Sequence, residues 1–198
     1  RQSVDGVLSD TAGVSLNAWR SSEAYAKRAS AVQRLQNQVP GLKVDDHSIF
    51  GTPHFVRSTI ALMSSPSKAG YADILASYLS ANADLFEMDA KELANARVVR
   101  DFDTHGIMHH LTHQQMEGGL DVFGAIMRSN YTTQGEIINI SSAFVPRPAG
   151  GWTVAQPVLS AEQALRTAAA SVGSPIVNPV FGDRAAGGVH DVGEDHRG

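Results

Sequence analysis

The sequence of 198 residues contains no cysteine. This absence excludes disulfide bonds, zinc sites with thiolate ligands and cysteine nucleophiles. It identifies no cellular compartment, because many bacterial secreted proteins also lack cysteine. Long apolar runs are missing too, and none approaches the roughly 18–20 residues that a membrane-spanning helix needs. We therefore expect no membrane as a partner.

A strong excess of charge of one sign is also missing, since the net charge is −4. Such a chain offers no electrostatic attraction for nucleic acid, which we do not expect as a partner. The hydrophobic share of 42% and the charged share of 18% are ordinary for a globular domain. The chain begins at Arg1 without a basic-then-apolar signal segment, so we expect a fragment or a processed piece.

The first part of the sequence favours helices. Residues 1–41 are expected to form a weakly ordered lead-in and a helix over about 21–38, which Val39-Pro40-Gly41 ends. The clearest helix is predicted over about 69–86. There, apolar residues recur at steps of three and four, which gives the helix one buried face.

From residue 96 the apolar pattern changes to period two, which indicates strands. Gly118-Gly119 is a natural two-residue turn because both glycines can adopt positive φ. The sequence therefore predicts an α+β fold, with an antiparallel β-meander packed against the long helix, flanking helices and mobile ends. The expected strands are 42–44, 52–57, 98–102, 107–117, 120–129 and 136–144.

A boundary is expected at 146–151, which is rich in proline and glycine. Beyond it, a helix over about 159–173 is predicted, and Ser160 and Gln163 have the spacing of a capping box. Residues 174–198 combine many Gly, Pro, Asp and Arg residues with few apolar ones, so we expect a flexible tail.

Four histidines, His105, His109, His110 and His113, suggest a metal site. On a helix, His109 and His113 would share one face at zinc-binding distance. However, the zinc helix of metalloproteases carries a glutamate base where this chain has His110. On a strand these side chains alternate between the two faces. We therefore interpret them as strand residues, with zinc binding through His109 and His113 as the alternative.

Other candidates for chemistry are weaker. The tail pairs His190-Asp191 and Asp195-His196 can chelate a divalent ion, although a polar linker is the favoured interpretation. The carboxylates Glu117, Asp121 and Asp103 lie near predicted turns, and no spacing pairs them as acid and base. The residues by themselves favour a non-catalytic domain.

The predicted hairpin carries a distinctive pattern of residues, which are Gln114, Gln115, Gly119, Val122, Phe123, Gly124 and Ala125. This pattern resembles the signature of the fungalysin/thermolysin propeptide domain. The likeness extends in consistent order over about residues 44–171. We expect Phe123 to be a core aromatic, with a role as a binding anchor as the alternative.

The resemblance implies the proregion of a secreted zinc metalloendopeptidase, which assists folding of the protease domain and keeps it inactive. It implies a propeptide domain over 42–148 and, over 149–173, a linker with the first helix of a second, incomplete proregion domain. The partner would be the cognate protease domain, which would hold the zinc, and this chain would need no cofactor. The alternative is a stand-alone secreted binding or structural module with the same fold.

Overall fold

The computed structural model describes residues 23–48, 50–88, 90–147, 158–184 and 190–194. These residues divide into two compact units. The first contains the described residues up to 115 together with 122–147, and the second contains 116–121 and the described residues from 158 onward. The expected lead-in before residue 20, the linker at 148–157 and Asp195-His196 lie outside the described residues.

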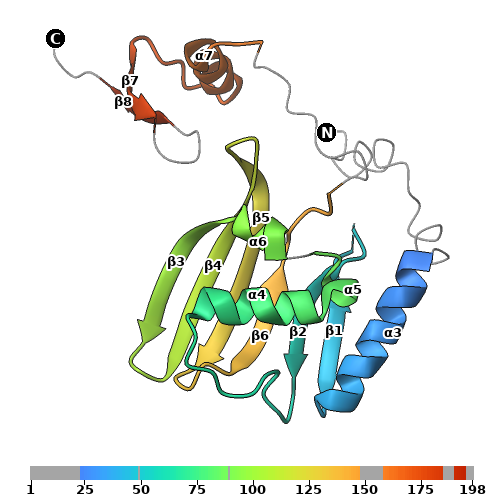
Figure 1. Ribbon diagram of the computed structural model, residues 1–198. Helices are drawn as coiled ribbons and strands as arrows, with labels where there is room; N and C mark the ends of the chain where they lie inside the picture. Colours follow the sequence, from blue (N-terminus) through green and yellow to red (C-terminus); the bar gives the residue numbers. More distant parts are fainter. Residues whose placement is uncertain (1–22, 49, 89, 148–157, 185–189, 195–198) are drawn as a thin grey trace. The chain divides into compact units, whose positions relative to one another are not determined.

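The first unit contains a six-stranded sheet in the order β1-β2-β6-β5-β4-β3, with helices on one face (Figure 1). The prediction of an α+β fold with an antiparallel meander is confirmed, since β3 to β6 are consecutive neighbours. The helices are α3 (Glu23–Gln38), α4 (Tyr71–Ala81), α5 (Ala83–Phe86) and α6 (Ala90–Ala94). The strands are β1 (Leu42–Asp46), β2 (Pro53–Ser58), β3 (Arg97–Thr104), β4 (Met108–Glu117), β5 (Leu120–Thr132) and β6 (Ile137–Ser142).

The long helix predicted over 69–86 is interrupted at Asn82, which separates α4 from α5. The Asn82 side chain donates a hydrogen bond to the carbonyl oxygen of Tyr78 at 2.9 Å. Asparagine competes in this way with the helical backbone, which explains the break. Leu85 still becomes buried, because the short α5 continues along the same core.

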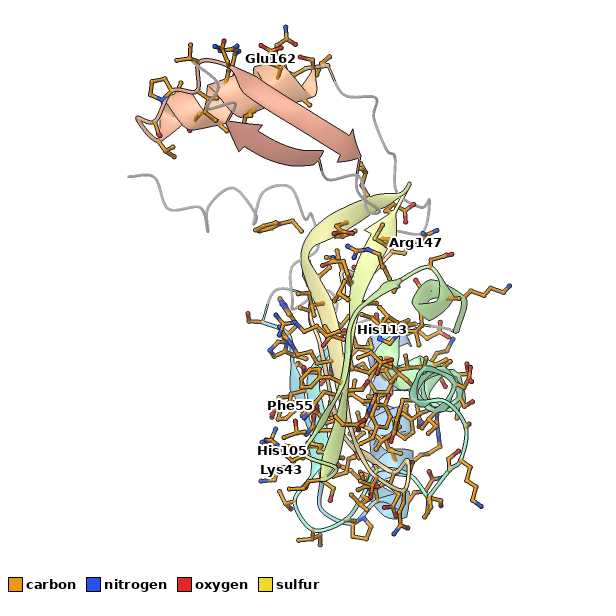
Figure 2. The ribbon with its side chains drawn as sticks, turned by 90° about the vertical axis from the view of Figure 1, so that its left-hand side faces the viewer. Lys43, Phe55, His105, His113, Arg147 and Glu162 are labelled. Carbon is orange, nitrogen blue, oxygen red and sulfur yellow. The ribbon has the colours of Figure 1, made fainter. Side chains whose placement is uncertain are left out.

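The core lies between this helical layer and the inner face of the sheet. Ile74, Leu75 and Leu79 of α4 are buried there, as their spacing predicts. The sheet contributes buried side chains at alternate positions, which are Val56, Leu111, Ala125, Met127, Tyr131 and Ile140. The opposite face of the sheet is covered by none of the described helices of this unit (Figure 2).

The second unit contains α7 (Ala161–Ser171) and a two-stranded sheet of β7 (Pro179–Arg184) and β8 (His190–Glu194). The predicted capping box of α7 is confirmed, with Ser160 and Gln163 each bonding the backbone amide of the other. The strands were not expected from the glycine- and proline-rich composition of the tail. No described helix in either unit is long and apolar enough to span a membrane.

Candidate functional site

The β4–β5 hairpin turns through Gly118 and Gly119, as predicted. Their φ angles are +55° and +79°, in the left-handed region that favours glycine. Backbone geometry in this turn therefore explains why the pattern has a glycine at position 119. The remaining residues of the pattern lie on the strands on either side of this turn.

Gln114 lies in β4 and is buried, with its side-chain amide directed at the backbone of β5. The amide donates hydrogen bonds to the carbonyl oxygens of Val122 and Ala125, at 2.7 and 3.1 Å. Between these two residues Gly124 has a φ of +71°. This conformation shifts the alternation of β5, so that Val122 packs against the core and Ala125 is buried in it.

Phe123 is 102% exposed, so the expectation of a core aromatic is wrong. The cause is the irregularity at Gly124. It keeps Val122 and Ala125 on the core side, and Phe123 is therefore directed away from it. The sequence did not show this, because a glycine within a strand pattern leaves open which neighbour turns outward.

Gln115 joins β4 to the chain that follows β6. Its carboxamide donates to the carbonyl oxygen of Val145 and accepts from the Val145 amide, both at 2.8 Å. Both glutamines of the pattern therefore support the backbone around the hairpin. Together with Gly124, they fix the course of the segment that presents Phe123.

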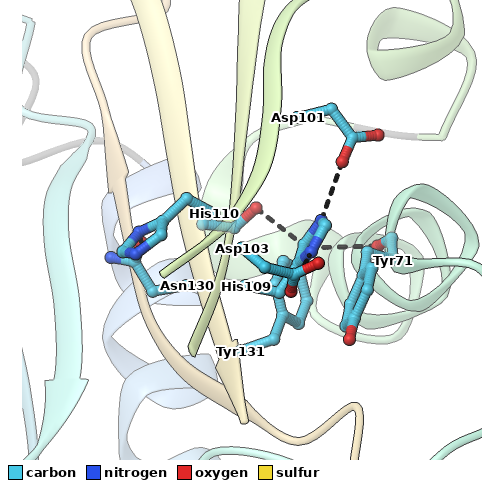
Figure 3. A network of polar contacts seen from close by, with 8 residues as sticks. Tyr71, Asp101, Asp103, His109, His110, Asn130 and Tyr131 are labelled. Atoms are coloured by element: carbon cyan, nitrogen blue, oxygen red, sulfur yellow. Dashed lines mark hydrogen bonds and ion pairs between the residues drawn. The ribbon is translucent and has the colours of Figure 1, made fainter. Parts of the chain in front are cut away.

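The predicted alternation of the β4 histidines between the two faces of the sheet is found. His109 lies on the helical face, where its ring stacks on Tyr71 of α4 with centroids 3.6 Å apart (Figure 3). Its Nε2 and Nδ1 atoms lie 2.9 and 3.0 Å from carboxylate oxygens of Asp101 and Asp103 of β3, and Nδ1 is hydrogen-bonded to Asp103. His109 therefore joins the edge strand, β4 and α4.

His110 lies on the opposite face in a row of polar side chains. The Asn130 amide donates to Asn139 Oδ1 at 2.7 Å, so the Asn130 oxygen accepts from His110 Nδ1 at 2.6 Å. His110 Nε2 is then left to accept from the Thr104 hydroxyl at 2.8 Å. The ring of His110 also stacks on Phe102, with centroids 4.8 Å apart. This row crosses four neighbouring strands.

His113 is 3% exposed and faces the helical layer. Its Nδ1 is buried without a hydrogen-bond partner among the described residues. Burial lowers the pKa of its imidazole below the ordinary value of 6.5, and the charge of Asp101 opposes this shift. The side chain is therefore a neutral core residue at neutral pH. Zinc binding through His109 and His113 remains the untested alternative.

The remaining candidates do not converge on one site. His105 occupies the turn between β3 and β4 with a φ of +50°. Glu117 ends β4, Asp121 is the second residue of β5, and Asp103 is hydrogen-bonded to His109. Within the described ranges, no group of three or more His, Cys, Asp or Glu side chains is placed to hold a metal ion. His190 and Asp191 lie in β8.

Comparison with known proteins adds no assignment. No protein-family model matches this sequence, and no curated protein matches it. The candidate functional site is therefore defined by its own geometry. It consists of the exposed Phe123 on the supported hairpin and of the polar sheet face that carries His110.

Proposed function

We propose that this chain is a proregion of a secreted zinc metalloendopeptidase. In this role it binds the protease domain, assists its folding and keeps it inactive, and it performs no catalysis itself. The proposal rests on the resemblance of the hairpin pattern to fungalysin/thermolysin propeptide domains. The protease domain, and not this chain, would hold the catalytic zinc.

One observation supports a binding role most directly. Phe123 is fully exposed, although Gln114 and Gly124 fix the backbone beside it. Burying an exposed Phe side chain is worth about 1.5–3 kcal/mol, so a partner that covers it gains affinity. A supported segment also loses little conformational entropy on binding. Phe123 is therefore suited to anchor a protein partner.

The strand histidines fit a structural role within such a module. His109 is held by two carboxylates and the ring of Tyr71. His110 is held by Thr104 and Asn130. These contacts organise the sheet and its helical layer, which a rigid binding surface requires.

An inhibition assay tests the proposal. The purified chain is added to the mature metalloendopeptidase encoded in the same reading frame, and peptide hydrolysis is measured. We expect activity to fall with increasing chain, and Phe123→Ala to raise the inhibition constant about tenfold or more, as expected of an anchor residue. Unchanged hydrolysis at saturating chain overturns the inhibitory role.

Ile60→Ala is the matched control, because Ile60 is also a large exposed apolar residue, at 76% exposure. It should leave inhibition unchanged. Both variants should keep the wild-type free energy of unfolding, since neither side chain is buried. A stop codon in place of a protease domain would instead favour the stand-alone secreted module, for which the same exposed Phe123 would be the anchor.

A further inference from the structure

One face of the six-stranded sheet lies opposite the helices and is the uncovered face of the sheet. This uncovered face carries a distinct set of side chains. Leu42 and Val56 point into the core, so the residues between core positions on β1 and β2 point to the other side. Figure 2 shows Lys43 and Phe55 on that side of the sheet, away from the helices. The same alternation places Arg128 of β5 there, next to the buried Met127.

The edge strand β3 adds a further cation to this face. Arg100 pairs with Thr112 of β4, and Thr112 alternates with the core residue Leu111. Directly opposite residues of an antiparallel pair share a face, so Arg100 also lies on the uncovered face. Arg100 is exposed. Cations are thus present at both edges of the sheet and on β5.

The polar row of His110 lies on the same face and leads toward Lys43 at the β1 edge. Asn139 of β6 is opposite Asn130 of β5 on one side and opposite Arg57 of β2 on the other. Arg57 in turn is opposite Lys43 of β1. The Asn130 carboxamide donates to Asn139 and accepts from His110, and these two hydrogen bonds hold the central part of this row in one arrangement. The surface is therefore preorganised.

Charge on the uncovered face is unbalanced. Arg57 is neutralised by Asp45 at 2.5 Å and lies over the ring of Phe55. Lys43, Arg100 and Arg128 form no ion pair with any described residue. These unpaired cations are therefore the charges of this face that are open to the carboxylates of a partner.

We propose that the uncovered face is a docking surface for an acidic segment of a protein, with Lys43, Arg100 and Arg128 as its charge contacts. The carboxylates of such a segment complement these cations, and the amides of Asn130 and Asn139 suit polar protein groups. A single-stranded nucleic acid is less favoured, because the rings of Phe55 and Phe102 on this face already contact Arg57 and His110 and are not free to stack on bases. Identifying the segment with the protease domain rests on the proposed function.

Binding of poly-glutamate to the isotope-labelled full chain, followed by NMR at low and high salt, tests the surface. We expect amide shifts on β1, β5 and β3, which disappear at high salt. Shifts confined to the helical face, or no shifts at millimolar peptide, overturn the proposal. A single-stranded oligonucleotide of equal length that binds more tightly than poly-glutamate overturns the assignment to a protein partner.

Charge reversal gives the quantitative test. The triple variant Lys43→Glu, Arg100→Glu and Arg128→Glu should weaken poly-glutamate binding by roughly tenfold or more. The control is Lys27→Glu, Arg34→Glu and Lys68→Glu. It makes the same change of net charge at exposed positions outside the β-strands. Equal losses in the two triple variants would show a nonspecific charge effect and overturn the surface.

The same variants separate this surface from the proposed function. If the wild-type chain inhibits the protease and the strand variant inhibits it equally well, the proregion role stands and the uncovered face is not the contact. If the wild-type chain fails to inhibit but binds poly-glutamate through this face, the proregion role fails and the docking surface stands. A wild-type chain that does neither overturns both.

Discussion

The side chain of Gln115 and the backbone of Val145 are joined by two hydrogen bonds of 2.8 Å, one in each direction. A carboxamide has the same donor and acceptor as a peptide group, so this contact reproduces a rung of a β-ladder. It ties the end of β4 to the segment after β6. The two are 30 residues apart in the chain.

Replacing Gln115 by Met should remove this connection while keeping the length of the side chain. The amide and the carbonyl of the partly buried Val145 would lose their partner, and we expect a loss of about 1–3 kcal/mol in the free energy of unfolding. Urea denaturation measures this loss. Gln134→Met, at an exposed turn position, should change stability by less than about 0.5 kcal/mol. Equal effects of the two variants would contradict the role of Gln115.

Gly124 should be sensitive to substitution for a backbone reason alone. Its φ is +71°, and an added Cβ atom would meet no atom within 4 Å. A side chain at position 124 would therefore meet no steric overlap. Its only cost is that of holding a non-glycine residue in the left-handed conformation, which is about 1–2 kcal/mol for an ordinary residue. We expect Gly124→Val to be destabilising by this amount. Gly124→Asn should cost less, because asparagine tolerates this conformation.

Thermal and urea denaturation of these two variants give the comparison. The same variants also probe how Phe123 is presented, because a β5 strand that regains regular alternation would turn the Phe123 ring toward the core. Hydrogen exchange at the amides of β5 would detect that change. Equal stability of the valine and asparagine variants would argue against a conformational requirement at Gly124.

The stack of His109 on Tyr71 should appear as a coupling energy. In a double-mutant cycle with His109→Leu and Tyr71→Leu, we expect about 0.5–1.5 kcal/mol of interaction from the ring contact. The loss of the His109 contacts to Asp101 and Asp103 occurs on both sides of the cycle and cancels. His110→Leu with Tyr71→Leu is the control, because His110 faces the opposite side of the sheet. A similar coupling in both cycles would refute the stack as its source.

The extent to which the sequence predicted this fold differs between elements. Period two over residues 107–129 predicted β4 and β5, and the adjacent glycines predicted their turn. The break at Asn82 was missed because the apolar period continues through it. Competition of one side chain with the backbone is a local geometric effect that a hydrophobic pattern does not record.

The candidate site was predicted in part. The resemblance directed attention to Gln114, Gln115 and Gly124 but gave no reason for them, which the hydrogen bonds of the hairpin provide. Arg28 was missed. The sequence of α3 suggests that Arg28 faces solvent like the other cations of this helix. Its side chain is instead buried and hydrogen-bonded to Gly51 and Asp46. Such a partner, distant in sequence, can be identified only once the strands are placed.

His113 should make the stability of the fold depend on pH. Burial lowers its pKa in the folded state below the ordinary value of 6.5. The unfolded chain therefore binds a proton more readily. Stability is fully present above about pH 6.5, falls as the pH decreases below that value, and levels off once the folded imidazole is protonated too. Urea denaturation at a series of pH values between about 7.5 and 4.5 should show this decline.

His113→Leu should reduce the decline, because a leucine in the same buried position cannot bind a proton. Some decline should remain, since burial and the neighbouring His54 also lower the pKa of His47. The control is His105→Asn in the exposed β3–β4 turn, where asparagine tolerates the positive φ. It should retain the wild-type pH profile. If His113→Leu also retains that profile, protonation of His113 is not what destabilises the fold in acid.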